Sequence, residues 1–258
     1  MKPKPGETNL FYSEKILNLA HRGARKQAPE NTLPAFRLAA ELGADGIELD
    51  AQLSKDGTAV IIHDFTLDKT TDGHGLVRDF SLAELKALDA GIHFSPEFAG
   101  TPIPTLEEVF AALGPVLLIN VELKSNALRD NGLEAEVIRL IENFNLQDRV
   151  ILSSFNPFAL NRAYRLNPRI KRGYLWATDL PLLLRWKLFR PLAHEDMFHP
   201  QWDTVTAQTV RRAHAKNRPV NVWTTNEPDD MRRMIALGVD AIMTDYPDRL
   251  RQVLDASG

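Results

Sequence analysis

Two histidines and three acids stand beside short apolar runs of the chain, namely His21, His63, Glu48, Asp50 and Glu122. Imidazoles exchange protons near neutral pH, so two of them can serve as a general acid and a general base. Three carboxylates in one small space would raise each other's pKa unless a cation compensated their charge. Oxygen ligands in a chain without cysteine favour calcium or magnesium over zinc, and the choice between these two stays open. The set therefore predicts acid–base chemistry beside one divalent cation.

Two cationic side chains accompany this set: Arg22 follows His21 directly, and Lys124 stands two positions after Glu122. Cations beside a metal and two proton-transfer groups suit a phosphodiester. Its cleavage requires a deprotonated nucleophile, a protonated leaving alkoxide and stabilised charge on the phosphoryl oxygens. The alternative is that Arg22 and Lys124 only pair with the acids in a structural ion network. We expect both to contact the phosphate of a substrate.

The fold must bring these side chains together, and the pattern of the chain indicates how. Short apolar runs alternate with helical patterns nearly from end to end, which is typical of βα units and a parallel sheet. Eight runs are predicted as strands: 16–20, 46–50, 117–123, 150–154, 169–175, 197–200, 219–224 and 241–244. Helices are predicted between them, one behind Thr32 and one behind a capping box of Thr105 and Glu108.

This alternation and the length of 258 residues predict the α/β class and a (β/α)8 TIM barrel, formed by a single domain over residues 1–258. Reactive groups of a barrel lie at the carboxyl ends of its strands, where His21, Glu48, Asp50 and Glu122 all fall. Glu48 and Asp50 are two positions apart on one strand, so both enter the mouth of the barrel and Leu49 points towards the helices.

Two segments depart from simple alternation. The turn signal 55–57 between 51–54 and 58–64 predicts a hairpin, and a turn centred near Asp56 brings His63 back level with Leu49. The stretch 65–101 is rich in Thr, Asp, Gly and Pro and is too long for an ordinary βα loop. We expect it to be a small insertion after the second strand.

Composition excludes several classes of protein. The chain has 34 acidic and 31 basic residues, a net charge of −3 and no cysteine, which rules out disulfides, thiolate zinc sites and cysteine nucleophiles. A chain with this slightly negative net charge does not attract the negatively charged backbone of a nucleic acid, so we expect no nucleic-acid partner. No apolar stretch of signal-peptide length occurs near the N-terminus, and we expect a cytoplasmic location. The five other histidines are predicted to be surface or loop residues.

An apolar segment over 180–192 carries Arg185, Lys187 and Arg190 and falls short of the roughly 20 residues that a bilayer span requires. Its basic residues do not gather on one helical face, so apolar surface is left partly uncovered. It either packs on the barrel or a neighbouring subunit, or makes a peripheral contact with a membrane or an acyl chain. The oligomeric state is not predicted.

The order of the motifs resembles that of the glycerophosphodiester phosphodiesterase family. The motifs are His21-Arg22-Gly23, Pro29-Glu30-Asn31-Thr32, Glu48-Leu49-Asp50, Lys55-Asp56-Gly57, His63-Asp64, Glu122-Leu123-Lys124 and Val222-Trp223-Thr224-Thr225-Asn226. The match spans nearly the whole chain, and the ordered set is far more specific than any one triplet. Thr225 stands where the family often has valine, which leaves the chemistry untouched.

The resemblance implies residue roles as well as a fold. Glu48, Asp50 and Glu122 would be metal ligands, His21 and His63 the acid–base pair, and Arg22 and Lys124 phosphate contacts. Three further residues have an ordinary structural alternative beside a predicted substrate contact. Glu30 and Asn31 precede a helix, where Asn31 or Thr32 also suits an N-cap, and Trp223 suits either the barrel core or a wall for the glycerol or headgroup.

The activity implied is metal-dependent hydrolysis of a small-molecule glycerophosphodiester to sn-glycerol 3-phosphate and an alcohol. Either water or the adjacent glycerol hydroxyl of the substrate could be the nucleophile, the latter through a cyclic phosphate. One alternative is a lysophospholipase D acting on lysophospholipids, which the apolar segment 180–192 favours. A more distant alternative is a non-catalytic barrel that binds phosphodiesters.

Overall fold

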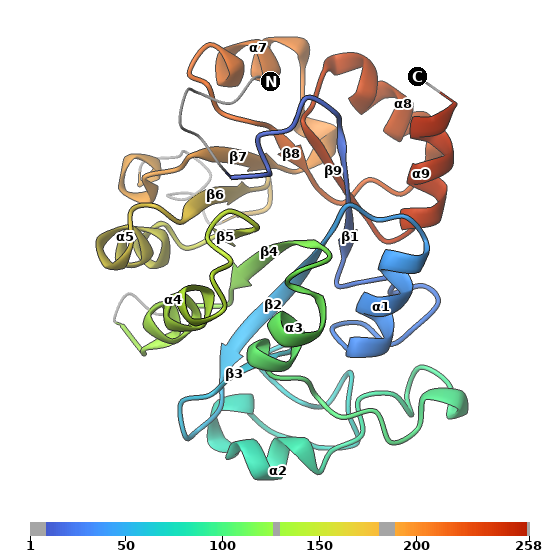
Figure 1. Ribbon diagram of the computed structural model, residues 1–258, viewed down its shortest axis with the longest axis vertical. Helices are drawn as coiled ribbons and strands as arrows, with labels where there is room; N and C mark the ends of the chain where they lie inside the picture. The colour runs from blue at the N-terminus through green and yellow to red at the C-terminus, as the bar shows by residue number, and fades with distance from the viewer. Residues whose placement is uncertain (1–8, 126–129, 181–188, 257–258) are drawn as a thin grey trace.

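The computed structural model describes residues 9–125, 130–180 and 189–256, and within them eight parallel strands form a barrel (Figure 1). The strands are β1 (Leu17–His21), β2 (Gly46–Leu53), β4 (Leu118–Leu123), β5 (Val150–Ser154), β6 (Lys171–Trp176), β7 (Met197–Pro200), β8 (Asn221–Val222) and β9 (Ala241–Thr244). Their order is β7-β6-β5-β4-β2-β1-β9-β8, and single parallel bridges between residues 198 and 220 and between 201 and 223 join β7 to β8. The predicted (β/α)8 TIM barrel and its eight strands are confirmed.

Helices cover the outside of this barrel (Figure 1). Those of at least eight residues in the described part are α1 (Leu33–Glu41), α3 (Leu106–Leu113), α4 (Leu133–Asn143), α5 (Pro157–Leu166), α7 (Ala207–His214), α8 (Pro228–Leu237) and α9 (Pro247–Asp255). Short 3-10 turns lie at η3 (Arg190–Ala193) and η4 (Trp202–Thr204). Thr32 caps α1 through its hydroxyl, and the predicted capping box of Thr105 and Glu108 begins α3.

The predicted hairpin follows the second barrel strand. β3 (Ala59–Ile61) pairs antiparallel with the end of β2, and Ala51 lies opposite Ile61. The backbone N–H of Ile62 donates to the Asp50 carbonyl at 2.9 Å, so the same register continues beyond β3. This register brings His63 back level with Leu49, as the turn centred at Asp56 predicts.

The insertion over 65–101 lies below β3 in Figure 1 and contains η1 (Val77–Asp79), α2 (Leu82–Lys86) and η2 (Pro96–Phe98). It packs on the hairpin through a small apolar cluster of its own. That cluster consists of Val60, Ile62, Leu67, Val77, Leu85 and Ile103, all of them buried. The insertion thus packs beside the barrel against β3, the strand that leads to His63.

The barrel alternates residues between its interior and its helical layer. Leu49 points outward into the main apolar cluster, as predicted. The prediction of His199 as a surface or loop residue is wrong, because its ring points inward from β7 and is fully buried. Its Nε2 lies 3.0 Å from the side-chain amide of Asn221, and burial lowers its pKa to about 3. Gly173 makes space for the His199 ring, since a Cβ at position 173 would lie 2.3 Å from it.

Residues 181–188, the middle of the apolar segment predicted over 180–192, lie outside the described residues. In the part of the chain that is described, no helix is both long enough and apolar enough to cross a membrane.

Candidate active site

Strand register places the reactive residues side by side at the carboxyl ends of β1, β2 and β4. His21 is paired with Glu48 across β1 and β2, and Asp50 is paired with Glu122 across β2 and β4. Just beyond β1 the backbone turns sharply, with φ of 81° at Gly23. A Cβ on this glycine would lie 2.7 Å from the backbone carbon of Ala35, so only glycine permits the close approach of α1.

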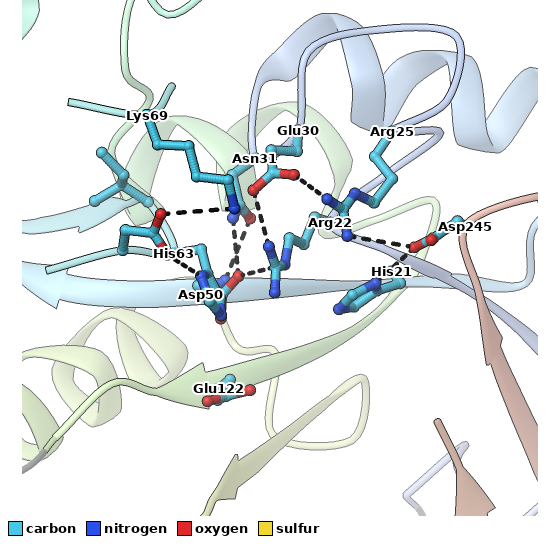
Figure 2. Close-up of polar contacts among 12 residues, drawn as sticks. His21, Arg22, Arg25, Glu30, Asn31, Asp50, His63, Lys69, Glu122 and Asp245 are labelled. Atoms are coloured by element: carbon cyan, nitrogen blue, oxygen red, sulfur yellow. Dashed lines mark hydrogen bonds and ion pairs between the residues drawn. The ribbon is translucent and has the colours of Figure 1, made fainter. Parts of the chain in front are cut away.

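These strand ends open into a cavity of about 360 Å³ that is lined by both histidines and by two of the three acids: His21, His63, Glu48 and Glu122. Arg22 and Trp223 line it as well. Asp50 is almost fully buried next to them, 1% exposed. Figure 2 shows His21, Arg22, Asp50, His63 and Glu122 grouped around the mouth. The tertiary structure therefore brings the predicted acids and bases together.

The three acids fit a metal site. One carboxylate oxygen each from Glu48, Asp50 and Glu122 lies within 4.8 Å of the other two. Burial and repulsion from the other two acids raise the pKa of Glu48 well above its usual range, and burial raises that of Glu122 to about 7. Among the described residues Asp50 Oδ1 is buried without a hydrogen-bond partner, although it lies 3.6 Å from Lys124 Nζ. Oxygen donors of this kind, one of them without a hydrogen bond, suit a hard divalent cation.

Two basic side chains also pair with these acids. Arg22 Nε lies 3.2 Å from Asp50 Oδ2, and Lys124 Nζ lies 3.1 Å from Glu122 Oε1 and 3.6 Å from Asp50 Oδ1. Burial alone would raise the pKa of Asp50, but Lys124, Arg22 and His63 together lower it. Within the described residues Glu48 has no such lysine or arginine partner, and its Oε2 accepts from the backbone N–H of Arg22 at 3.1 Å. Arg22 and Lys124 therefore neutralise Asp50 and Glu122 more than Glu48, whose negative charge can pair with a further cation.

His21 is held by an acid that the sequence interpretation missed. Its Nδ1 lies 2.7 Å from Asp245 Oδ1 (Figure 2). Asp245 Oδ2 accepts from the Asn226 amide at 3.0 Å. Burial lowers the pKa of His21, against the hydrogen bond with Asp245. Because the carboxylate accepts the proton of Nδ1, Nε2 is left to exchange protons, 4.0 Å from Glu48 Oε2. Asp245 directly follows β9, so the strand-end rule could have found it.

His63 has an equivalent arrangement on the hairpin side. Its Nδ1 lies 2.6 Å from Asp64 Oδ1, and Lys69 of the insertion lies 3.7 Å from Asp64 Oδ2. Burial lowers the pKa of His63, while Asp50 raises it. Both imidazoles thus have Nδ1 fixed by a carboxylate, which leaves Nε2 of each for proton transfer. Within the described residues the insertion does not line the cavity, and it supports His63 from the side.

Glu30 and Asn31 contact the predicted site residues and do not line the main cavity. Glu30 Oε1 accepts from Arg22 at 2.9 Å, and its other oxygen pairs with Arg25. Asn31, with φ of 59°, donates its side-chain amide to Asp50 Oδ2 at 2.9 Å. Its Oδ1 accepts from the backbone N–H of Asp50 at 3.3 Å. The capping hydroxyl of the following helix belongs to Thr32, not to Asn31.

Trp223 forms part of the cavity wall. Its indole N–H donates to the His199 carbonyl at 2.8 Å, and its ring meets that of Phe155 edge to face, with 5.4 Å between centroids. Phe155 and Leu175 also line the cavity and were missed by the sequence interpretation. Phe155 directly follows β5, so its position after a strand was the available signal.

The fold is a (β/α)8 barrel, and at the carboxyl ends of its strands lie three acids and two histidines that are each hydrogen-bonded to a carboxylate. The chain is thus a TIM-barrel protein with groups suited to acid–base chemistry. Over residues 21–249 the sequence matches the glycerophosphoryl diester phosphodiesterase family. The chain belongs to this family and is a phosphoric diester hydrolase.

Individual relatives resemble nearly the whole chain. A glycerophosphodiester phosphodiesterase of Caldanaerobacter subterraneus is 43% identical over 95% of this chain and 100% of its own length. One from Bacillus altitudinis is 38% identical over 89% of this chain and 94% of its own. Among solved structures, an Oleispira antarctica phosphodiesterase in complex with the product sn-glycerol-3-phosphate superposes with a TM-score of 0.82 at 35% identity, covering 95% of this chain and 99% of its own.

Proposed function

We propose that the protein hydrolyses glycerophosphodiesters to sn-glycerol 3-phosphate and an alcohol, with one divalent cation, calcium or magnesium. The observation that carries the proposal is the convergence of His21, His63, Glu48 and Glu122 on one cavity of a chain from this family. The Oleispira antarctica relative with bound sn-glycerol-3-phosphate supports the same product class.

Glu48, Asp50 and Glu122 would hold the cation. When bound, it neutralises charge on the phosphoryl oxygens and so lowers the barrier to attack at phosphorus. Arg22 lines the cavity beside these acids and contacts the phosphate. Lys124 lies within 4 Å of both Asp50 and Glu122 and lines a different pocket, so it adds positive charge next to these acids. Both side chains favour an anionic substrate over a neutral one.

The two histidines divide the proton transfers. Asp245 fixes Nδ1 of His21 and Asp64 fixes Nδ1 of His63, so each ring presents Nε2 to the substrate. One takes a proton from the nucleophile, and the other gives a proton to the leaving alkoxide. The nucleophile is either water or the neighbouring glycerol hydroxyl, and phosphorus NMR during turnover decides between them by the presence of a cyclic phosphate.

Glu30 and Asn31 act indirectly in this proposal. Glu30 orients the Arg22 guanidinium, and Asn31 holds the Asp50 carboxylate from two sides. Trp223 forms the wall for the headgroup, with its indole fixed by the hydrogen bond to the His199 carbonyl. The direct substrate contacts that the sequence indicated for Glu30 and Asn31 stay a prediction beside these positioning roles.

The test is release of glycerol 3-phosphate from a panel of diesters, with and without chelator. Wild type should lose activity with chelator and regain it with calcium or magnesium, and His21→Ala and Glu48→Ala should lose activity under all conditions. His214→Ala is the matched control, because His214 pairs with Asp240 outside the cavity. Chelator-resistant turnover, or full activity in either site variant, would contradict the proposal.

A second candidate is a lysophospholipase D, because apolar side chains including Leu175 and Leu180 line one side of the cavity and could cover an acyl chain. Comparison of kcat/KM on glycerophosphocholine and lysophosphatidylcholine decides between the two. A preference of about tenfold for the lipid, equivalent to about 1.4 kcal/mol, would favour the second candidate. The non-catalytic alternative predicts no metal-dependent turnover of either substrate.

A further inference from the structure

The cavity has two halves of different chemistry. In the strand order, β6 stands four strands away from β1 in either direction around the ring, so residues after β6 face those after β1 across the mouth. His21, Arg22 and the acids belong to β1, β2 and β4. The opposite half, formed after β5, β6 and β8, is lined by Phe155, Leu175, Leu180 and Trp223 together with one acid, Asp179.

Phe155 and Trp223 form an aromatic corner in that half. Their ring centroids lie 5.4 Å apart and their planes meet at 89°, so the two rings form adjacent walls at right angles. The hydrogen bond from the Trp223 indole to the His199 carbonyl, 2.8 Å long, fixes the orientation of the larger ring. Ring faces attract cations, and aromatic rings arranged around a quaternary ammonium group recognise it well. The corner is therefore preformed for a cation.

Asp179 adds a negative charge to the lining of the same cavity. It lies three residues beyond the end of β6, its side chain is exposed, and it lines the cavity. Within the described residues it has no hydrogen bond or ion pair. An apolar chain bound alone in this half would cover the carboxylate without compensating its charge, which is unfavourable. A ligand group that is both positively charged and partly apolar would contact the rings and pair with Asp179.

We propose that Asp179, Phe155 and Trp223 form a subsite for a cationic alcohol group, an ammonium or quaternary ammonium such as choline. The inference rests on the proposed function and narrows its substrate class to zwitterionic glycerophosphodiesters. Arg22 attracts the phosphate on one side of the cavity, and Asp179 attracts the ammonium on the other. Opposite charges at opposite ends select both the substrate and its orientation, with the alcohol as the leaving group.

The test compares glycerophosphocholine with its 3,3-dimethylbutyl analogue, which has the same shape but a carbon in place of nitrogen. Wild type, supplied with calcium or magnesium, should show a kcat/KM at least tenfold higher for the choline diester. In Asp179→Asn and in Trp223→Leu the ratio should fall below threefold. Asp79→Asn is the matched control, since Asp79 is an exposed aspartate of the insertion, away from the cavity, and the wild-type ratio should persist there.

Titration calorimetry of both diesters into His21→Ala gives a readout that does not need turnover. A Kd about tenfold lower for the choline diester, lost on adding Asp179→Asn, supports the subsite even if no diester is hydrolysed and the proposed function fails. Equal kcat/KM and equal Kd for the two diesters would overturn the inference, as would a preference that neither Asp179→Asn nor Trp223→Leu changes.

Discussion

Replacing Asp245 by asparagine tests whether this residue sets the proton position on His21. The Asn226 amide beside it has a fixed orientation, because its Oδ1 accepts from the backbone N–H of Asp245 at 2.9 Å and from the Thr244 hydroxyl at 3.2 Å. Its Nδ2 therefore faces Asp245. In Asp245→Asn the new amide oxygen must face Asn226, so the new NH₂ group faces His21 Nδ1. The proton of His21 then moves to Nε2, the nitrogen that exchanges protons in the proposed mechanism.

The size of the effect follows from this hydrogen bond. A hydrogen bond to a charged group contributes about 1.5–3 kcal/mol, and Asp245 is only 7% exposed, so water replaces the lost contact poorly. At about 1.4 kcal/mol per tenfold change in rate, kcat/KM should fall by about 10- to 150-fold. Arg25 lies 3.6 Å from Asp245 Oδ1 and would lose this carboxylate while keeping its pair with Glu30, which acts in the same direction if His21 is the acid.

The assay is initial-rate release of glycerol 3-phosphate at saturating calcium or magnesium, with metal affinity measured in parallel. Metal affinity should stay unchanged, since Asp245 is not one of the three acids of the proposed metal site. Asp240→Asn is the matched control, because Asp240 is also 7% exposed and lies 2.8 Å from His214 Nε2, outside the cavity. A loss of kcat/KM below threefold, or an equal loss in the control, would refute the reasoning.

The free energy of unfolding that Asp245 contributes, measured as the difference between wild type and Asp245→Asn, should depend on pH. Burial alone would raise the pKa of Asp245, but the hydrogen bond and charge of His21, and the charge of Arg25, lower it to about 2. The value in an unfolded chain is about 3.9, so the stabilisation is fully present above pH ~4 and is lost as the pH falls towards 2. The difference in free energy of unfolding between wild type and Asp245→Asn should narrow over this window in urea titrations. A constant difference would contradict the assignment.

Three further predictions concern the same cavity. Burial lowers the pKa of both His21 and His63, so the acid limb of the kcat/KM profile should lie below pH 6.5; a limb above pH 7 would contradict it. Calcium or magnesium at about 100 times its Kd should add about 2.7 kcal/mol of stability, measured as a chelator-sensitive rise in Tm, and Glu48→Gln should abolish this rise. Asn31→Gly, which tolerates the left-handed backbone but frees Asp50, should weaken metal binding by about 10- to 100-fold in calorimetry; a change in KM with intact metal affinity would instead indicate direct substrate contact.

Local pattern was enough to predict the barrel. Most strands contain a short apolar run, and several helices begin at a capping residue that the sequence shows, such as Thr105 with Glu108 before α3. The hairpin register was also predictable, because the turn at Asp56 and the two-residue period of a strand fix which residue returns beside Leu49. Strand ends were the least accurate, as in β8, where the predicted 219–224 shortens to Asn221–Val222.

The sequence also indicated the metal and acid–base set, because the carboxyl ends of parallel strands meet at one mouth wherever the strands lie in the chain. It could not indicate that Asp245 holds His21, because the two are 224 positions apart and meet only where β9 pairs with β1. The short motif around Glu30 and Asn31 was visible, yet its side chains turn towards Arg22 and Asp50 and not into the cavity.

By itself, the sequence determined the architecture and the kinds of groups at the mouth of the barrel, since period and strand-end position depend on neighbouring residues. Only the tertiary structure decided which acid orients which histidine, and that Phe155 and Trp223 meet at a right angle in a cavity that Asp179 also lines. Those contacts arise when distant strands close into a ring, and the closure sets distances that no local pattern records.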